Sequence, residues 1–218
     1  MRQLNETSLH LGPSKQSLLT SFRRVLGSRR FWAYTVCMAC STGTLYVFLG
    51  GAPLVMSSSF GGSSVALGLY LAMVPGGFVI GSYLTGILAS RVFRSHILIV
   101  ARVLTCAGLS TGLLVAASLD IRAPIFFIFC AFIGLGNGLT TPAVSMGVMS
   151  ERADLAGTAA GLSAAMSIGG GALISSVAGL YLDTTGSIHI LLSLLLASAS
   201  LALLAAFFAA LLDRPSPG

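Results

Sequence analysis

Residues 131–149 combine an apolar, membrane-like stretch with side chains that can form hydrogen bonds. Asn137 carries an amide where a membrane helix has little water to satisfy it, and Thr140 and Thr141 add hydroxyl groups. Pro142 removes one backbone N–H and weakens the helix just before it. Three glycines, Gly134, Gly136 and Gly138, leave one side of the helix without side chains. Such a helix either packs closely on its neighbours or lines a polar path through the membrane.

Elsewhere, the residues that could do covalent or metal chemistry are poorly placed for it. Cys37 and Cys40 have the spacing of a zinc or redox pair, but no histidine or acid lies nearby in this apolar stretch. They are therefore interpreted as two small apolar residues. His10 and His96 fall outside the apolar stretches, His189 stands at the edge of one, and none of the three pairs convincingly with a buried serine. We therefore expect that the protein is not an enzyme and that it has no metal site and no cofactor.

The composition is that of an integral membrane protein. Charged residues make up 8% of the chain and apolar residues 55%, and the mean hydropathy is +0.93. A soluble domain of this length carries about a quarter charged residues. The net charge of +6 does not indicate a nucleic-acid partner, because the positive residues cluster beside the apolar stretches, as membrane topology requires.

Six stretches are long enough to cross a hydrocarbon core, which needs about 20 helical residues. We predict an all-α membrane protein with a cytoplasmic basic linker over residues 1–30, a six-helix transmembrane domain over residues 31–212 and a cytoplasmic tail over residues 213–218. The predicted spans are residues 31–56, 64–90, 97–118, 124–149, 155–182 and 188–212.

The arginines predict the orientation of the chain. If the N-terminus is inside, eleven of the 12 Lys and Arg residues lie on the inner side, and only Arg122 lies on the outer side. This asymmetry places both termini in the cytoplasm, and we expect a bacterial inner membrane. Arg102 lies within the third span and is expected to snorkel to the inner headgroups. No Asp or Glu falls within any predicted span.

Two short matches indicate an internal repeat. Gly86 corresponds to Gly179 and His96 to His189, both at an offset of 93 residues, and a polar turn joins the same two helices in each copy. A proline also stands late in the first span of each copy. Spans one to three and four to six therefore form two three-helix units. Because each unit has an odd number of spans, the two copies face opposite ways in the membrane, which is typical of transporters.

Four motifs carry a resemblance to a known family. They are Leu4-Asn5-Glu6-Thr7, Gly50-Gly51-Ala52-Pro53, Gly136-Asn137-Gly138-Leu139-Thr140-Thr141-Pro142 and Leu155-Ala156-Gly157-Thr158-Ala159. With them the chain resembles the carboxy-terminal half of a major facilitator superfamily transporter, and in particular the Bcr/CflA group of bacterial drug:proton antiporters. The resemblance implies half of a major facilitator fold, with helices seven to twelve present.

The turn that follows Gly86 resembles the loop motif "G-x-L-a-D-r-x-G-r" of this superfamily. Ser90 replaces the acid of the motif and Phe93 replaces its second glycine, so a charge-relay role for this loop is in doubt. The residues that we expect to serve conformational change are Gly86, Arg91, Arg94 and Pro142.

In this family the substrate cavity lies between the two halves, near the middle of the membrane. Spans one, two, four and five of this chain would face it. The candidate substrate-binding residues are Thr44, Phe48, Tyr70, Met73, Asn137, Thr141 and Met166, with Tyr34, Ser41 and Tyr46 as further lining residues. Aromatic, methionine and hydroxyl side chains suit bulky, weakly polar ligands. Each could equally be a packing residue, and Asn137 could bond a neighbouring helix instead.

The resemblance implies half of a drug or small-molecule:proton antiporter that works by alternating access. Its substrate would be amphipathic and drug-like, the proton gradient would drive it, and the proton-coupling acids would lie in an amino-terminal half. Two alternatives stay open: a homodimeric six-helix permease or channel, in which a second copy takes the place of that half, and a truncated membrane remnant that does not transport.

Overall fold

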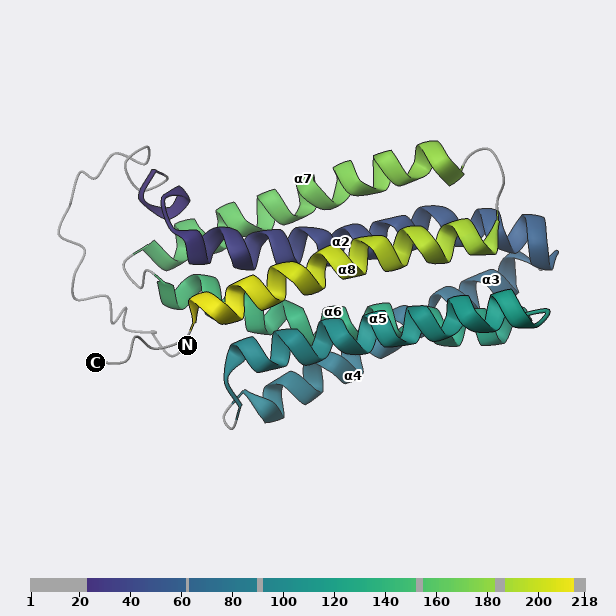
Figure 1. Cartoon of the computed structure of the whole chain (residues 1–218), viewed down its shortest axis with the longest axis horizontal. Coiled ribbons are helices and arrows are strands. Elements are labelled where there is room, and N and C mark those ends of the chain that lie inside the picture. The colour runs from purple at the N-terminus through teal and green to yellow at the C-terminus, as the bar shows by residue number, and fades with distance from the viewer. Residues whose placement is uncertain (1–22, 62, 90–91, 152–154, 183–186, 214–218) are drawn as a thin grey trace, which may run out of the picture.

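A computed structural model describes residues 23–61, 63–89, 92–151, 155–182 and 187–213. These residues form helices and short connections without strands, and six segments are long and apolar enough to cross a membrane. The elements are α2 (Arg29–Val55), the π-helical turn η1 (Met56–Phe60), α3 (Ser64–Leu71), α4 (Met73–Leu88), α5 (Arg94–Ser118), α6 (Ala123–Glu151), α7 (Ala156–Leu182) and α8 (Ile188–Leu212) (Figure 1). The predicted all-α, six-span architecture is confirmed. Most of the predicted linker and tail lies outside the described residues, as do the Leu4–Thr7 motif and Arg91.

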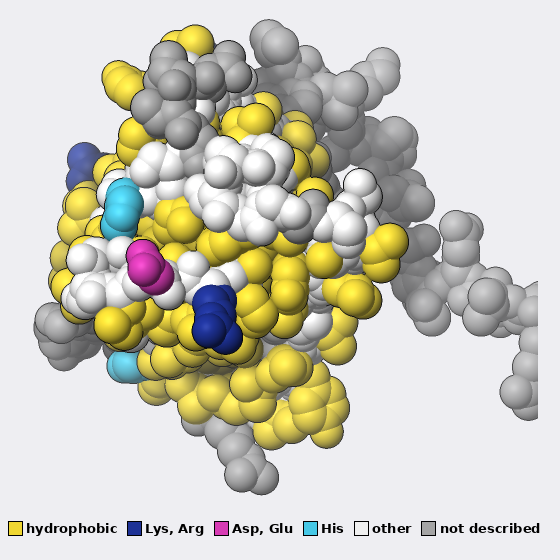
Figure 2. Space-filling model, turned by 90° about the vertical axis from the view of Figure 1, so that its right-hand side faces the viewer, with side chains coloured by type: hydrophobic (Ala, Val, Ile, Leu, Met, Phe, Trp, Pro, Cys, Tyr) yellow, Lys and Arg dark blue, Asp and Glu magenta, His cyan; other side chains and the backbone are white. Residues whose placement is uncertain are grey.

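The helices run along one long axis in alternating directions (Figure 1). We call the end at which α2 and α5 begin and α8 ends the terminal end, and the opposite end the distal end. Figure 2 looks onto the distal end, where hydrophobic side chains surround few charged ones. Asp120 and Arg122 lie in the short connection between α5 and α6 at this end.

The second span consists of two helices that meet at Ala72. Pro75 explains the break, because it has no N–H to offer to the carbonyl of Leu71, the last residue of α3, and its ring crowds that carbonyl. The Ala72 N–H still bonds the Gly68 carbonyl at 3.1 Å, so the chain bends without losing its helical course. The span predicted over residues 64–90 is one candidate membrane crossing, Ser64–Leu88, with this break inside it.

The helix boundaries reveal the two-fold repeat directly. α2 begins at residue 29 and α6 at residue 123, a separation of 94 residues; the same separation divides the beginnings of α5 and α8, at residues 94 and 188. The packing follows the same rule, since α4 packs on α6 as α7 packs on α2, and α5 packs on α6 as α8 packs on α2. The predicted pair of inverted three-helix units is confirmed, and α2 and α6 form its central pair.

Glycines bring α4 and α6 into backbone contact. A β-carbon on Gly77 would lie 2.6 Å from the Ala131 carbonyl oxygen, and Gly81, Gly134 and Gly138 face the opposing backbone in the same manner. The Gly77-x-x-x-Gly81 spacing in the sequence predicts a close-approach face, and this four-glycine contact confirms it. Such contacts hold membrane helices together because lipid supplies no hydrophobic driving force between them.

The same spacing of Gly157 and Gly161 on α7 predicts a second close-approach face, but neither glycine meets a described helix. A β-carbon on either glycine would meet no atom within 4 Å. α7 and the second span are the least buried helices of the bundle: 22% and 17% of an 18-residue apolar stretch of each is buried, against 39% to 56% in the other spans. The spacing of small residues indicated a contact, but the bundle leaves this face open.

Candidate substrate path along α2 and α6

Two grooves flank the central pair of helices. The first, which we call the distal groove, lies between α2, the second span and α6 and has a volume of about 500 Å³. Its lining is apolar except for Asn137 and comprises Leu45, Leu49, Gly68, Leu71, Ala72, Val74, Pro75, Phe78, Val79, Gly134 and Asn137. It occupies the part of α2 and α6 nearer the distal end.

The second groove, the terminal groove, lies between α2, α6 and α7 and has a volume of about 210 Å³. Five of its lining residues carry a hydroxyl group, and these are Thr42, Thr141, Ser145, Ser163 and Ser167. The Ser167 hydroxyl is buried and has no hydrogen-bond partner within the described part of the chain. This groove occupies the part of α2 and α6 nearer the terminal end and is the more polar of the two.

The repeat relates the two grooves, because it exchanges α2 with α6 and α4 with α7. They therefore open in opposite halves of the membrane thickness. Asn137 lines the distal groove and Thr141 the terminal groove, one helical turn apart on α6. The Thr141 hydroxyl donates to the backbone carbonyl oxygen of Asn137 at 2.9 Å. The linings of the two grooves thus come within one helical turn of each other on α6.

Asn137 belongs to a buried polar network that joins three helices. Its side-chain oxygen, Oδ1, accepts a hydrogen bond from the hydroxyl of Ser41 on α2. The guanidinium of Arg102 on α5 approaches the same oxygen, with Nη2 at 3.5 Å. Nη2 also donates to Thr140 Oγ1 at 2.7 Å. The network fixes the Asn137 side chain from the interior of the bundle.

Arg102 does not snorkel, and that prediction is wrong. The side chain is 0% exposed. It lies about 12 Å along α5 from Arg94, the first residue of the helix. Gly136 provides the space, because a β-carbon there would lie 3.0 Å from Arg102 Nη2 and would collide with Thr105 Oγ1. The Nε and Nη1 atoms of Arg102 have no hydrogen-bond partner among the described residues.

The other predicted binding residues take packing positions and line neither groove. The Thr44 hydroxyl donates to the Cys40 carbonyl oxygen at 2.9 Å and lies 3.0 Å from Ser198 Oγ on α8. Phe48 and Tyr70 both pack on Phe127, which Tyr70 stacks against at a centroid distance of 5.1 Å.

Met73 and Met166 are partly buried and pack against the two hydrophobic clusters of the core. Of the further lining residues, Tyr34 donates a hydrogen bond to Asp213, which directly follows α8, and Tyr46 is half-buried. The structure thus brings Asn137, Thr141 and Ser41 together near the middle of the central pair of helices, α2 and α6.

Two of the residues expected to serve conformational change make contacts between helices. Arg94 Nη1 donates to the Met146 carbonyl at 2.9 Å and so ties the beginning of α5 to the last turns of α6. Pro142 leaves the Gly138 carbonyl without its helical N–H, and Ser82 Oγ of α4 donates to that oxygen at 3.3 Å. Gly86 faces open space.

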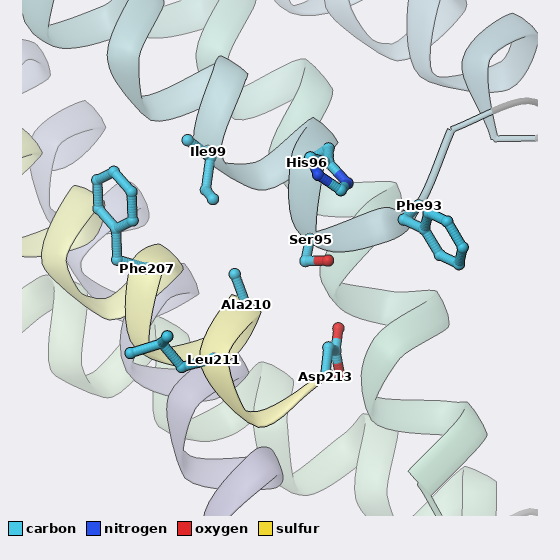
Figure 3. A pocket seen from close by; sticks show the side chains of 8 residues that line it. All are labelled: Phe93, Ser95, His96, Ile99, Phe207, Ala210, Leu211 and Asp213. Atoms are coloured by element: carbon cyan, nitrogen blue, oxygen red, sulfur yellow. The ribbon is translucent and has the colours of Figure 1, made fainter. Parts of the chain in front are cut away.

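A third hollow lies between α5 and α8 at the terminal end and has a volume of about 470 Å³ (Figure 3). Figure 3 shows Ile99 and Phe207 on its apolar side, and Ser95, His96 and Asp213 around its other side. It does not border α2 and α6. Within the described ranges there is no group of three or more side chains that could hold a metal ion.

Comparison with known proteins agrees with this architecture. A family model described as Major Facilitator Superfamily matches residues 3–176. No curated protein matches the chain. The family match covers most of the chain, and the six apolar helices are those of an integral multi-pass membrane protein. The chain belongs to the major facilitator superfamily and is a membrane transporter.

Proposed function

We propose that this chain is the carboxy-terminal six-helix half of a small-molecule:proton antiporter of the Bcr/CflA type, working by alternating access in a bacterial inner membrane. The observation that carries the proposal is the pair of grooves along α2 and α6, which the inverted repeat places in opposite halves of the membrane thickness. A substrate that leaves one groove for the other passes the turn between Asn137 and Thr141. Inverted repeats around a central site are the usual basis of alternating access.

The uncovered faces of the bundle support a missing half. Gly68 and Gly76 on the second span and Gly157 and Gly161 on α7 all face open space. The two helices exchange under the repeat, and each borders one groove. A second six-helix unit that covered both faces would close the grooves and would gain the close helix contacts that these glycines permit.

The distribution of charged residues supports the proposal that the other half carries the proton-coupling acid. No Asp or Glu lies in the interior of the described spans. A proton-coupled transporter needs an acid within the membrane, so the other half would supply it. The large apolar lining of the distal groove supports an amphipathic, drug-like substrate.

Expressed alone, the chain should give no export that depends on a proton gradient. Together with the first six helices of a Bcr/CflA antiporter, supplied as a separate polypeptide, it should export at least one member of a panel of cationic, neutral and anionic amphipathic dyes. Dye efflux from inverted membrane vesicles, with and without an uncoupler, measures both conditions.

The variant Gly161→Leu tests the docking face in the same assay. Its side chain has free space within this chain, so the abundance of the chain should stay near that of the parent while copurification with the other half is lost. Gradient-dependent export by the chain alone would instead favour the homodimeric permease, and two identical chains should then crosslink through α7. A chain that never transports with any half would be a remnant.

The proposed orientation has its own test. Phe60→Cys at the distal end should react with a membrane-impermeant maleimide added to intact cells, whereas Phe93→Cys at the terminal end should react only after the cells are opened. The native cysteines Cys37, Cys40 and Cys130 are buried and should stay silent. Labelling of position 93 from outside would reverse the orientation.

A further inference from the structure

The hydrogen bonds of Asn137 determine which end of its amide borders the distal groove. A guanidinium has only donors, so the atom that faces Arg102 must be the oxygen. The Ser41 hydroxyl donates to this same oxygen, which uses both of its acceptor positions. The Asn137 nitrogen, Nδ2, makes no hydrogen bond within the described part of the chain, although the residue lines the groove. The amide therefore offers two N–H donors to the groove.

A positive charge stands behind these donors. Arg102 is completely buried, and the charged side chains of the described residues otherwise lie at the ends of the spans. Its Nη2 lies 3.5 Å from Asn137 Oδ1, so the guanidinium polarises the amide and strengthens the donors on its far side. In a low-dielectric interior, a charge acts over a longer range than it does in water. The buried cation and the amide donors therefore both favour a negatively charged group at the single polar point of the groove.

The rest of the groove suits an apolar body. Leu49, Phe78 and Val79 line it at the rim, and its volume of about 500 Å³ is within the range of drug-sized sites. We propose that the distal groove binds amphipathic organic anions, with a ring system against these side chains and a carboxylate or sulfonate on Asn137 Nδ2. A lipophilic cation would meet donors it cannot use and a charge of its own sign. This inference rests on the proposed function for the role of the groove, and it names the substrate class.

Three probes with one ring system test the charge preference directly. Radiolabelled 2-naphthylacetate, 2-naphthylacetamide and 2-naphthylethylamine carry a negative, a neutral and a positive head on the same naphthyl body. The purified chain in nanodiscs of zwitterionic lipid should bind the anion about tenfold or more tightly than the amine, with the neutral amide between them. Equilibrium dialysis gives all three dissociation constants without a partner half or a gradient, so a failure of transport leaves this result interpretable.

Asn137→Asp is the decisive variant. The new carboxylate keeps an oxygen for Ser41 and Arg102, neutralises the Arg102 charge and replaces the two N–H donors by a second oxygen. Its affinity for the anion should fall about tenfold or more, and its affinity for the amine should rise. Thr111→Val is the control, because it removes a hydroxyl from an exposed position on α5 outside the lining of both grooves, and it should leave both affinities at the parent values.

Equal binding of anion and amine by the parent chain would overturn the proposal without reference to any variant. So would an Asn137→Asp chain that elutes as a folded monodisperse species and binds the anion as the parent does. Displacement of the naphthyl probes when anionic lipid replaces part of the nanodisc lipid would make the groove a lipid site and would also overturn it.

Discussion

The variant Gly81→Ala should unfold or severely loosen the helix bundle. A β-carbon on Gly81 would run into the Leu135 carbonyl oxygen and would lie 2.9 Å from the Leu139 nitrogen. Both obstacles are backbone atoms, which cannot turn aside as a side chain can, so α4 must move away from α6. Overpacking costs about 1–3 kcal/mol, and we expect the upper part of that range. The measurement is the free energy of unfolding in mixed micelles, followed by circular dichroism during titration with SDS.

Gly76→Ala is the matched control, because it lies in the same helix and its β-carbon would meet no atom within 4 Å. Alanine favours a helix over glycine by about 1 kcal/mol, so this variant should be as stable as the parent or slightly more stable. Equal losses in the two variants would mean that α4 does not contact α6 through its glycines. A harmless Gly81→Ala would have the same consequence.

The membrane class, the six spans and the inverted repeat could be predicted from the sequence, because apolar length, odd span number and motif offset are local or periodic signals. The break at Ala72 has a signal in the sequence, since Pro75 stands four residues after Leu71, the last residue of α3. A proline within a long apolar stretch is compatible with both a bent helix and two helices, so the pattern alone did not predict the break.

The contact faces were only half predictable. Gly77 and Gly81 have the same spacing as Gly157 and Gly161, yet among the described helices only the first pair meets a neighbour. Spacing shows that a helix has a thin face, whereas the choice of partner depends on how all six helices are arranged. The outward face of α7 therefore becomes informative only when the fold is known.

Arg102 shows the strongest limit of a sequence interpretation. Its depth in α5 agreed with snorkelling, because a long side chain can reach the headgroups along its own helix. The alternative depends on residues far away in the sequence: Gly136 opens the space, and Thr140 and Asn137 supply the acceptors. The signal in the sequence was the run of glycine, amide and hydroxyl residues in the fourth span, but nothing local joined it to an arginine in the third.

A double-mutant cycle on Arg102 and Asn137 should show that the two residues are energetically coupled. Arg102→Met keeps much of the volume and removes a buried cation that has no acidic partner within the described spans. Such a charge costs several kcal/mol to bury, so this variant should be at least as stable as the parent and should unfold at higher SDS. Anion binding in the distal groove should nevertheless weaken, since the amide is no longer polarised.

Asn137→Leu should lower the free energy of unfolding by different amounts in the parent chain and in the Arg102→Met chain. Beside Arg102 it removes the oxygen that Nη2 approaches, leaves the guanidinium with Thr140 alone and should cost about 1–3 kcal/mol. In the Arg102→Met background, only the Ser41 hydroxyl loses its acceptor, so the cost should be about 1 kcal/mol smaller. SDS titration of the four chains under one condition gives the coupling energy. An Asn137→Leu cost that is the same in both backgrounds would separate the amide from the guanidinium, and the positive character assigned to the distal groove would then lack its source.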